Sequence, residues 1–286
     1  MLLSGMPWTL NTSVFSSPSS GITDDSYSYT NTTAVVVDGA TALDESIRVD
    51  GVPAPAWLAT EFSIRTARRL ASDPYDSVTV FKDVIAELRA RWESLGGNPL
   101  TGPLGAFACA YVRDDDLMFS TVGDCVVVVR YVDDSVEVSR DTSVPVLDSK
   151  VVTAMVEIAT SKGISVRDAR QHVTDMLRFN RTLRNRKNGY SALDLADDRW
   201  TRTGCYFGST CHRVKDFLVM TDGFWDCVEY GLVSVDELVA VVSEGKADEL
   251  AASLLELTNS DPAWDAYPRL KDIDDMTVLY ATLEQQ

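Results

Sequence analysis

Four acidic motifs stand at the ends of β-rich runs in this chain, so aspartates lie where strands are expected to begin or end. The motifs are Val35-Val36-Val37-Asp38-Gly39, Val122-Gly123-Asp124, Val219-Met220-Thr221-Asp222-Gly223-Phe224-Trp225-Asp226 and Asp274-Asp275-Met276-Thr277-Val278. A single Asp-Gly after a strand is ordinarily a turn. Carboxylates at neighbouring strand ends can instead converge on one cleft, where their mutual repulsion is unfavourable without a cation.

The chemistry that suits such a set is the binding of hard divalent cations. Mg²⁺ and Mn²⁺ take oxygen ligands, and a typical site combines a few carboxylates with waters. The glycines that follow Asp38 and Asp222 lack a side chain, so a backbone carbonyl can approach a metal closely. The spacing therefore predicts a carboxylate centre for Mg²⁺ or Mn²⁺.

The elements around these motifs alternate between strand and helix periodicity. A Ser/Thr-rich segment, residues 1–33, is expected to form an irregular edge strand and loop, and Ala34–Val37 a buried strand. Two helices at 56–72 and 77–95 are predicted to form an antiparallel hairpin over one face of a sheet. Short β-rich runs then predict an antiparallel meander, at 106–112, 117–121, 126–131 and 136–139.

Helical spacing returns at 151–161 and 166–186. A strand at 217–221 precedes a helix from Val235, for which Ser234 and Glu237 form a capping box. A helix at 246–257 and a final strand at 277–282 complete the series. Since the strict alternation of a doubly wound fold is absent, the pattern predicts one α+β domain over residues 1–286, with antiparallel sheets flanked by helices.

Composition limits the classes of partner. The chain has 26 Lys and Arg against 43 Asp and Glu, a net charge of −17 over 286 residues. Such a surface repels phosphate backbones and anionic lipid, so neither nucleic acid nor a membrane is expected as a partner. The sequence from Met1 to Leu10 lacks the features of a secretory signal, and the five cysteines are odd in number without a CxxC pair. We expect a cytoplasmic protein with reduced, buried thiols.

The motifs resemble those of the metal-dependent protein phosphatases of the protein phosphatase 2C type, and they occur in family order. Asp24-Asp25 is similar to the early acidic pair and Asp38-Gly39 to the DG motif. Gly123-Asp124-Cys125 is similar to the GDS-type motif. Asp222–Asp226 is close to the DG-aromatic-Trp-Asp signature, and Asp274–Thr277 is similar to the DN-apolar-Thr motif. Residues 185–190 and 268–271 also resemble stretches of small bacterial members.

The resemblance implies a fold and a ligand set. The fold is a β-sandwich of two antiparallel sheets flanked by helix pairs, in four αββα layers, with the metals in a cleft at one end. Asp38 would bridge two cations, and the Gly39 carbonyl would bind one of them. Asp222 and Asp274 would complete the other shell, which Asp24 would reach through water. Asp124 and Asp226 would hold a third, weaker cation together with Asp222.

The implied activity is serine/threonine protein phosphatase, with Asp38 and Asp222 at the catalytic centre. Two Mg²⁺ or Mn²⁺ ions would activate a water that attacks phosphorus directly, without a phosphoenzyme. The substrates would be phosphoserine and phosphothreonine proteins. None of the five cysteines is then required as a nucleophile, and the chain lacks the C-x₅-R loop of cysteine phosphatases.

The chain departs from the family pattern at five places. Ala40 stands where many relatives have a histidine that can serve as general acid, and Thr41-Ala42 replaces a second glycine pair. The segment Ser19-Ser20-Gly21-Ile22 lacks the arginine with which some relatives bind substrate phosphate. Asp275 replaces the usual Asn and Cys125 the usual Ser. Loss of an acid or a phosphate clamp can slow turnover by orders of magnitude.

Two questions stay open at the level of sequence. A basic stretch includes Arg184 and Arg186, which could bind substrate phosphate or could belong to a solvated helix face near a C-terminus. The chain could also be a phosphatase-like module that binds metals or a phosphorylated partner with little turnover. Retention of the main aspartates favours the enzyme, whereas Ala40 and the missing arginine favour the module. An acidic scaffold without metal would leave the ordered motifs unexplained.

Overall fold

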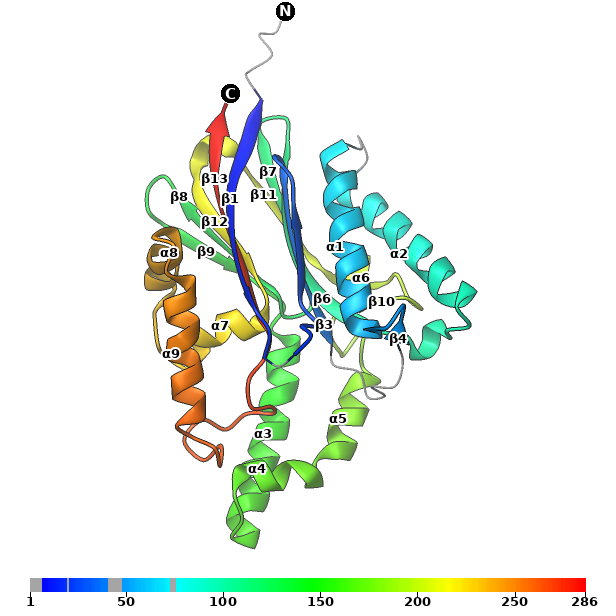
Figure 1. Ribbon diagram of the computed structural model, residues 1–286, viewed down its shortest axis with the longest axis vertical. Coiled ribbons are helices and arrows are strands. Elements are labelled where there is room, and N and C mark those ends of the chain that lie inside the picture. The colour runs from blue at the N-terminus through cyan, green and yellow to red at the C-terminus, as the bar shows by residue number, and fades with distance from the viewer. Residues whose placement is uncertain (1–6, 20, 41–47, 73–75) are drawn as a thin grey trace, which may run out of the picture.

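Two antiparallel sheets face each other in the computed structural model, which describes residues 7–19, 21–40, 48–72 and 76–286 (Figure 1). The five-stranded sheet has the order β1 (Trp8–Ser17), β13 (Met276–Gln285), β12 (Val214–Met220), β8 (Val126–Tyr131) and β9 (Val136–Ser139). The six-stranded sheet has the order β11 (Cys205–Thr210), β7 (Asp116–Val122), β6 (Leu104–Arg113), β3 (Thr33–Ala40) and β2 (Ser26–Tyr29), with β10 (Leu193–Asp194) beside β6. A small ribbon pairs β4 (Arg48–Val49) with β5 (Val52–Pro53).

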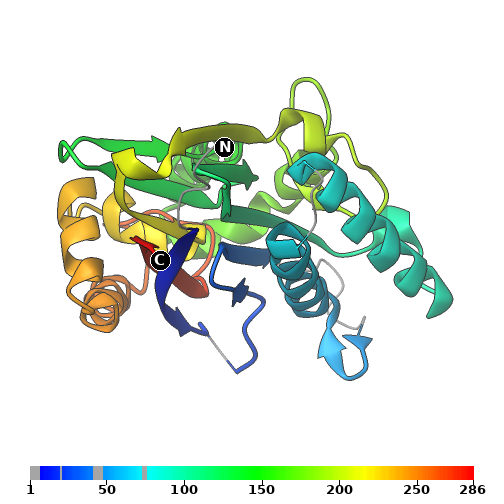
Figure 2. The same ribbon diagram turned by 90° about the horizontal axis from the view of Figure 1, so that it is seen from above.

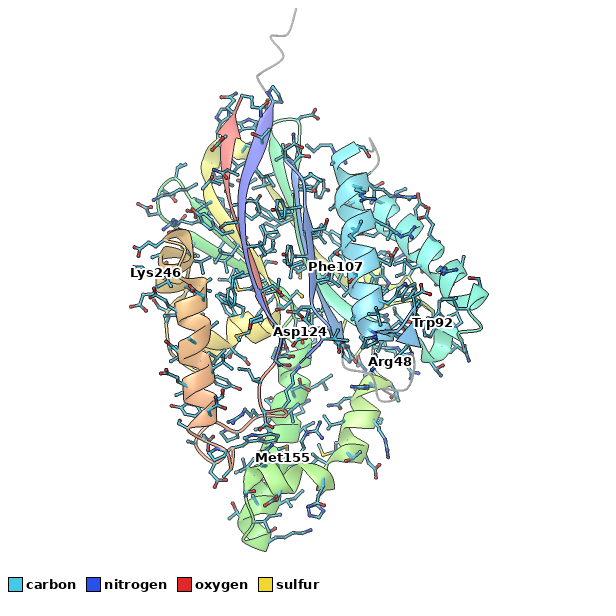
Figure 3. The ribbon with its side chains drawn as sticks, in the orientation of Figure 1. Arg48, Trp92, Phe107, Asp124, Met155 and Lys246 are labelled. Atoms are coloured by element: carbon cyan, nitrogen blue, oxygen red, sulfur yellow. The ribbon has the colours of Figure 1, made fainter. Side chains whose placement is uncertain are left out.

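Strand alternation divides the apolar side chains among three layers. In β3, Ala34 and Val36 point between the sheets, while Val35 and Val37 point toward the helices on the other side. This is the period of two that a strand buried on both faces requires. Phe107 of β6 faces the same helices, and it is labelled in Figure 3.

Helices cover the outer face of each sheet (Figure 2). The helices α1 (Ala54–Ser72) and α2 (Ser77–Ser94) cover the six-stranded sheet through one core cluster. The helices α7 (Asp222–Glu229), α8 (Val235–Ser243) and α9 (Ala247–Asn259) cover the five-stranded sheet through another. This arrangement confirms the predicted β-sandwich flanked by helices. No helix in the described part of the chain is long and apolar enough to cross a bilayer.

A separate helical unit lies beyond one end of the sheets (Figure 1). It consists of α3 (Ser143–Lys162), α4 (Val166–Ala169), a 3₁₀ turn at Arg170–His172 and α5 (Thr174–Arg181). Its core gathers Val151, Met155 and Val173 around Trp264, which comes from the loop before β13. The unit and that loop are therefore joined by apolar packing, and shorter elements complete the chain: 3₁₀ turns at Pro99–Thr101 and Cys211–Arg213, and α6 (Trp200–Thr203).

Several predicted elements are confirmed. The helical hairpin, the strands at 34–37 and 217–221 and the final strand all occur, with slightly different ends. The capping box of Ser234 and Glu237 is formed as predicted, with both reciprocal hydrogen bonds. Ser20 and the Thr41-Ala42 pair lie outside the described residues.

The predicted meander is wrong in its pairing. β6 pairs with β7 and β8 pairs with β9, but these two hairpins belong to different sheets. The chain crosses from one sheet to the other at Gly123, whose φ of 75° lies in the left-handed region that favours glycine. Periodicity could not show this crossing because it reports strands and not their partners.

Two further predictions are corrected. The helix expected over 166–186 is broken at Val173, which is buried in the core with Trp264, and ends at Arg181. Beyond it, Asn185 has a φ of 55°, and its side-chain amide bonds both backbone groups of Ala192, which fixes a turn instead of a helix. The segment 1–33 was expected to be an irregular edge strand and loop. Residues 8–17 instead form a regular strand that pairs along its length with β13.

Candidate metal centre

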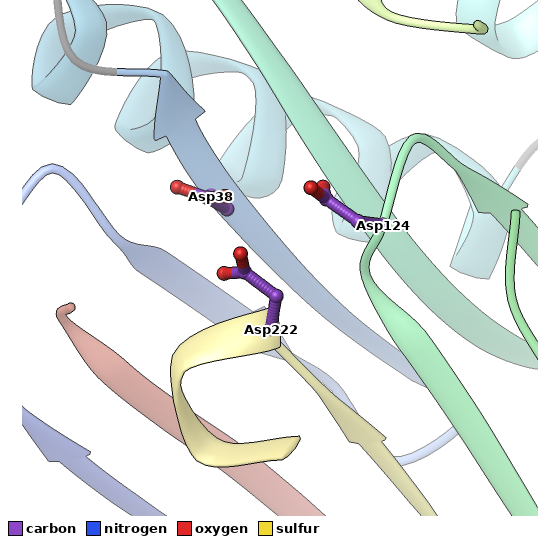
Figure 4. Close-up of side chains that lie close together, drawn as sticks. All are labelled: Asp38, Asp124 and Asp222. Atoms are coloured by element: carbon purple, nitrogen blue, oxygen red, sulfur yellow. The ribbon is translucent and has the colours of Figure 1, made fainter. Parts of the chain in front are cut away.

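Three carboxylates converge at the end of the sandwich that faces the helical unit. Asp38 comes from the end of β3, Asp124 from the crossing between β7 and β8, and Asp222 from the first turn of α7 (Figure 4). One oxygen atom from each lies within 4.8 Å of those of the other two. Residues 38 and 222 lie 184 positions apart in the chain. They meet because β3 and β12, which lie in different sheets, end at the same end of the sandwich.

The glycines beside two of these aspartates allow close backbone contacts. A Cβ atom on Gly39 would lie 2.6 Å from the carbonyl oxygen of Asp24, and the N–H of Gly39 donates to that same oxygen. A Cβ atom on Gly223 would lie 2.1 Å from the carbonyl oxygen of Asp275. These separations leave no room for a side chain, so each Asp-Gly pair brings another acidic segment up against the centre.

The N-terminal acidic pair reaches the centre through Asp25. The Asp25 carboxylate is 6% exposed and accepts a hydrogen bond of 2.9 Å from the hydroxyl of Thr221, the residue before Asp222. Burial raises the pKa of Asp25 to about 7, and the carboxylates of Asp222 and Asp275 add to the shift. Asp24, the residue predicted from sequence, contacts this region through its backbone, since its N–H donates to Asp275 and its carbonyl accepts from Gly39.

Asp275, which replaces the Asn of the motif that the sequence resembles, accepts three hydrogen bonds. Its carboxylate accepts hydrogen bonds from the N–H of Ser19 at 2.6 Å, the hydroxyl of Thr23 at 3.0 Å and the N–H of Asp24 at 2.6 Å. Burial alone would raise the pKa of Asp275, but these hydrogen bonds lower it. The departure from the family pattern therefore ties the loop before β2 to the segment that carries Asp274.

Asp274 lies beside the three converging carboxylates and has a cationic partner. One of its oxygens accepts from the N–H of Asp275 at 2.9 Å, and the other forms an ion pair with the ammonium of Lys271. Sequence analysis did not assign a role to Lys271. It noted only that residues 268–271 resemble stretches of small bacterial phosphatases, which does not indicate the direction of the Lys271 side chain.

Two more carboxylates border the same space. Asp226 lies one turn after Asp222 on α7, and Asp148 comes from α3 of the helical unit. Burial, with a further contribution from the charge of Asp222, raises the pKa of Asp226 to about 7 and that of Asp148 to about 6. The helical unit thus contributes an acid that the motif pattern did not include.

The electrostatics of the three converging residues call for a cation. Burial and the neighbouring carboxylate of Asp222 raise the pKa of Asp124 to about 8, and they raise the pKa of Asp38 well above its usual range. One oxygen of Asp222 is buried without a hydrogen-bond partner among the described residues. An unpartnered buried carboxylate oxygen is costly, and a set of carboxylate oxygens is the donor type that Mg²⁺ and Mn²⁺ prefer. The residues present therefore fit the expected metals.

A cavity of about 740 Å³ opens over these acids. Its wall is formed by the sheet edge, α3, α5 and the loop before β13, and Ala40 is part of it. Basic side chains also line it, namely Arg140, Arg170, Arg181, Arg269 and Lys271. Ala40, at the position where the resembled family pattern has a histidine, thus faces the cavity with only a methyl group.

The arginines singled out from sequence lie elsewhere. The guanidinium of Arg184 donates to the buried carboxylate of Asp194 at 2.8 Å and to the carbonyl of Leu100 at 3.2 Å. Arg186 is exposed and is not part of the cavity wall. Arg181, from the same basic stretch, does line the cavity. Arg181 is the last residue of α5, whereas Arg184 and Arg186 lie in the turns that follow. Which arginine faces the cavity could not be read from composition.

Cys125 and the two histidines contribute no reactive group to the cavity. Cys125 is buried next to Asp124, and burial together with the nearby carboxylates holds the pKa of its thiol well above the usual range. His172 lies against Lys162, and His212 packs against Trp8. Neither histidine lines the cavity. A thiolate or imidazole therefore has no evident place in the chemistry of this site.

Comparison with solved structures shows the same fold in bacterial phosphatases. The serine/threonine phosphatase Stp1 from Staphylococcus aureus has a TM-score of 0.56 and 16% identity, with 96% of this chain and 95% of that chain covered. The Mycobacterium tuberculosis serine/threonine phosphatase PstP/Ppp has a TM-score of 0.56 and 16% identity, with 96% and 99% covered. The catalytic domain of PstP in complex with two manganese ions has a TM-score of 0.53 and 13% identity, with 97% and 99% covered. No protein-family model and no curated protein sequence matches the chain.

Proposed function

We propose that this protein, which has the fold of bacterial serine/threonine phosphatases, hydrolyses phosphoserine and phosphothreonine in proteins with the help of two divalent cations. The observation that carries the proposal is the convergence of Asp38, Asp124 and Asp222 within 4.8 Å at the base of a cavity. A solved phosphatase of the same fold holds two manganese ions. Mn²⁺ or Mg²⁺ is accordingly the proposed cofactor.

Different aspartates would bind different cations. Asp38 converges with Asp124 and Asp222, and it would hold the two catalytic cations together with the Gly39 carbonyl. Asp222 and Asp274 would be further ligands of one of these cations, and the buried Asp25, in place of Asp24, would act through water. Asp124 and Asp226 would hold a third cation, and Asp148 borders the same space.

When bound, the two cations would lower the pKa of a water and stabilise negative charge on the phosphoryl group. In the reaction, the water oxygen bonds to phosphorus, the bond from phosphorus to the seryl or threonyl oxygen breaks, and that oxygen leaves as a hydroxyl. The protein contributes the orientation of the acids, which are fixed by strand ends and by the first turn of α7. Arg181 on the cavity wall would bind the phosphoryl oxygens, since a guanidinium suits phosphate geometry.

A second function is favoured by one specific feature, the methyl group of Ala40 at the cavity wall. Without an acid at that position, the leaving oxygen has no side-chain proton donor from β3. The site would then bind a phosphorylated partner with little turnover. This alternative predicts phosphopeptide binding that depends on metal but releases no phosphate.

One assay separates the two functions. Purified protein is incubated with a phosphothreonine peptide and Mn²⁺, Mg²⁺ or EDTA, and free phosphate is measured. Phosphate release that requires metal supports the phosphatase. Binding of the same peptide by fluorescence polarisation, without release at any metal concentration, would support the binding module and end the enzyme proposal.

A further inference from the structure

Lys271 places an ammonium group among the acids of the centre. Its side chain is about half exposed and lines the cavity, and its nitrogen forms an ion pair with Asp274. Loss of water contacts in the cleft would lower the pKa of Lys271. The carboxylates of Asp222, Asp38, Asp124 and Asp226 outweigh this effect and raise it. The ammonium therefore lies in the field of the same carboxylates that are proposed to hold the metals.

The backbone that carries Lys271 is firmly held. The guanidinium of Arg269, two residues earlier, bonds the carboxylate of Asp261 at 3.1 Å and the carbonyls of Thr258, Tyr267 and Asp272. The carbonyl of Leu270 accepts from Arg170, and the Leu270 side chain packs on the core of the helical unit. Only the four-carbon stem of Lys271 is left to move, and it opens onto the cavity.

We propose that Lys271 is a built-in counter-ion of this centre, which occupies the place of a cation at Asp274 and is displaced into the cavity when a divalent ion binds. The inference rests on the proposed metal centre, because it assigns Asp274 to a metal. An oxygen atom that forms an ion pair with an ammonium cannot at the same time coordinate a metal freely. Metal binding must therefore break this ion pair and then contend with the repulsion of a nearby positive charge.

Two measurable consequences follow from the competition. Removal of the ammonium frees Asp274 and should raise the affinity for Mn²⁺ by roughly tenfold, the scale of one charge-assisted hydrogen bond. Without metal, the same change leaves the carboxylates of the centre without their internal cation. The metal-free protein should then unfold at a lower temperature.

The test compares wild type with Lys271→Gln and with Lys187→Gln, an exposed lysine outside the cavity. Each protein is freed of metal with EDTA, dialysed and titrated with Mn²⁺ by calorimetry, and its melting temperature is measured in EDTA and in excess Mn²⁺. Lys271→Gln should bind Mn²⁺ more tightly than wild type and melt earlier in EDTA. Lys187→Gln should match wild type in both measurements.

Equal or weaker Mn²⁺ binding by Lys271→Gln, from a protein with a wild-type circular dichroism spectrum, would overturn the proposal. The absence of Mn²⁺ binding in all three proteins would overturn both this inference and the metal centre. Tighter binding by Lys271→Gln in a protein that releases no phosphate would support the counter-ion while contradicting the proposed enzymatic function.

Discussion

The hydroxyl of Thr221 donates a hydrogen bond of 2.9 Å to the carboxylate of Asp25 across 196 positions of sequence. The same hydroxyl oxygen accepts from the N–H of Thr277 at 3.0 Å. Thr221 directly precedes Asp222, and Thr277 follows the segment that carries Asp274. One buried hydroxyl therefore links three of the acidic motifs and fixes how they meet.

Replacement of Thr221 tests this link. Thr221→Val removes the hydroxyl while keeping the shape. It leaves the Thr277 N–H without its acceptor and removes one of the two hydroxyl groups, of Thr221 and Thr277, that bond the Asp25 carboxylate. We expect a loss of about 2 kcal/mol in the free energy of unfolding, measured by urea denaturation in EDTA. Thr221→Ser is the matched control and should retain most of the stability. Equal stability of the Val and Ser variants would contradict this role.

Asp275→Asn restores the residue that the family pattern favours, yet we expect it to destabilise this chain. The Asp275 carboxylate accepts from two N–H groups and one hydroxyl. An amide group offers one oxygen and would turn its NH₂ toward a donor. The expected loss is about 1–2 kcal/mol in urea denaturation. An unchanged or increased midpoint would show that the three bonds contribute little.

Stability without metal should fall as pH rises. Burial raises the pKa of Asp25 and Asp226 to about 7 and that of Asp124 to about 8, so the folded chain holds protons that the unfolded chain has released. Stability from this source is fully present below the ordinary carboxylate pKa of about 4, and it is lost as pH rises from there through about 7 to 8. The carboxylates that face these acids include Asp38, Asp148, Asp222, Asp275 and Glu229. The facing cations include Arg140 and the ammonium of Lys271, which stays charged in this range.

The measurement is the melting temperature in EDTA at pH 5.5 and 8.5, which should drop by several degrees. Asp124→Asn cannot ionise and should show a smaller drop than wild type. Saturating Mn²⁺ should remove most of the pH dependence, because metal holds the carboxylates in their charged form. A melting temperature that rises with pH in EDTA would be inconsistent with these shifts.

Arg181 and Arg186 allow a matched test of substrate binding, because Arg181 lines the cavity and Arg186 does not. Arg181→Gln should raise the KM for a phosphothreonine peptide roughly tenfold, the scale of one lost charge-assisted contact to phosphate. Arg186→Gln should leave KM unchanged. If the two variants give the same KM, Arg181 has no role in phosphate binding.

The sequence predicted the acids but not the groups that arrange them. Asp38 and Asp222 were identifiable because each follows a β-branched run and precedes glycine, a local pattern. The hydrogen bond from Thr221 to Asp25 joins residues far apart in the chain, and no periodicity reports it. Lys271 and Arg181 were not assigned for the same reason, since the direction of a side chain in a loop or at a helix end is set by tertiary packing. Likewise the crossing at Gly123 determines which sheet each hairpin joins, and this was predicted wrongly.

The converging aspartates are proposed to hold catalytic metal, and Asp222 is the residue to replace because one of its oxygens is buried without a partner among the described residues. Asp222→Asn is compared with Asp114→Asn, an exposed turn residue with a φ of 55°, which asparagine tolerates. Mn²⁺ binding by calorimetry and phosphate release from a phosphothreonine peptide are measured on both. The account predicts that Asp222→Asn loses at least tenfold in Mn²⁺ affinity and nearly all phosphate release, while Asp114→Asn behaves as wild type. Wild-type metal binding and phosphate release by Asp222→Asn would contradict it.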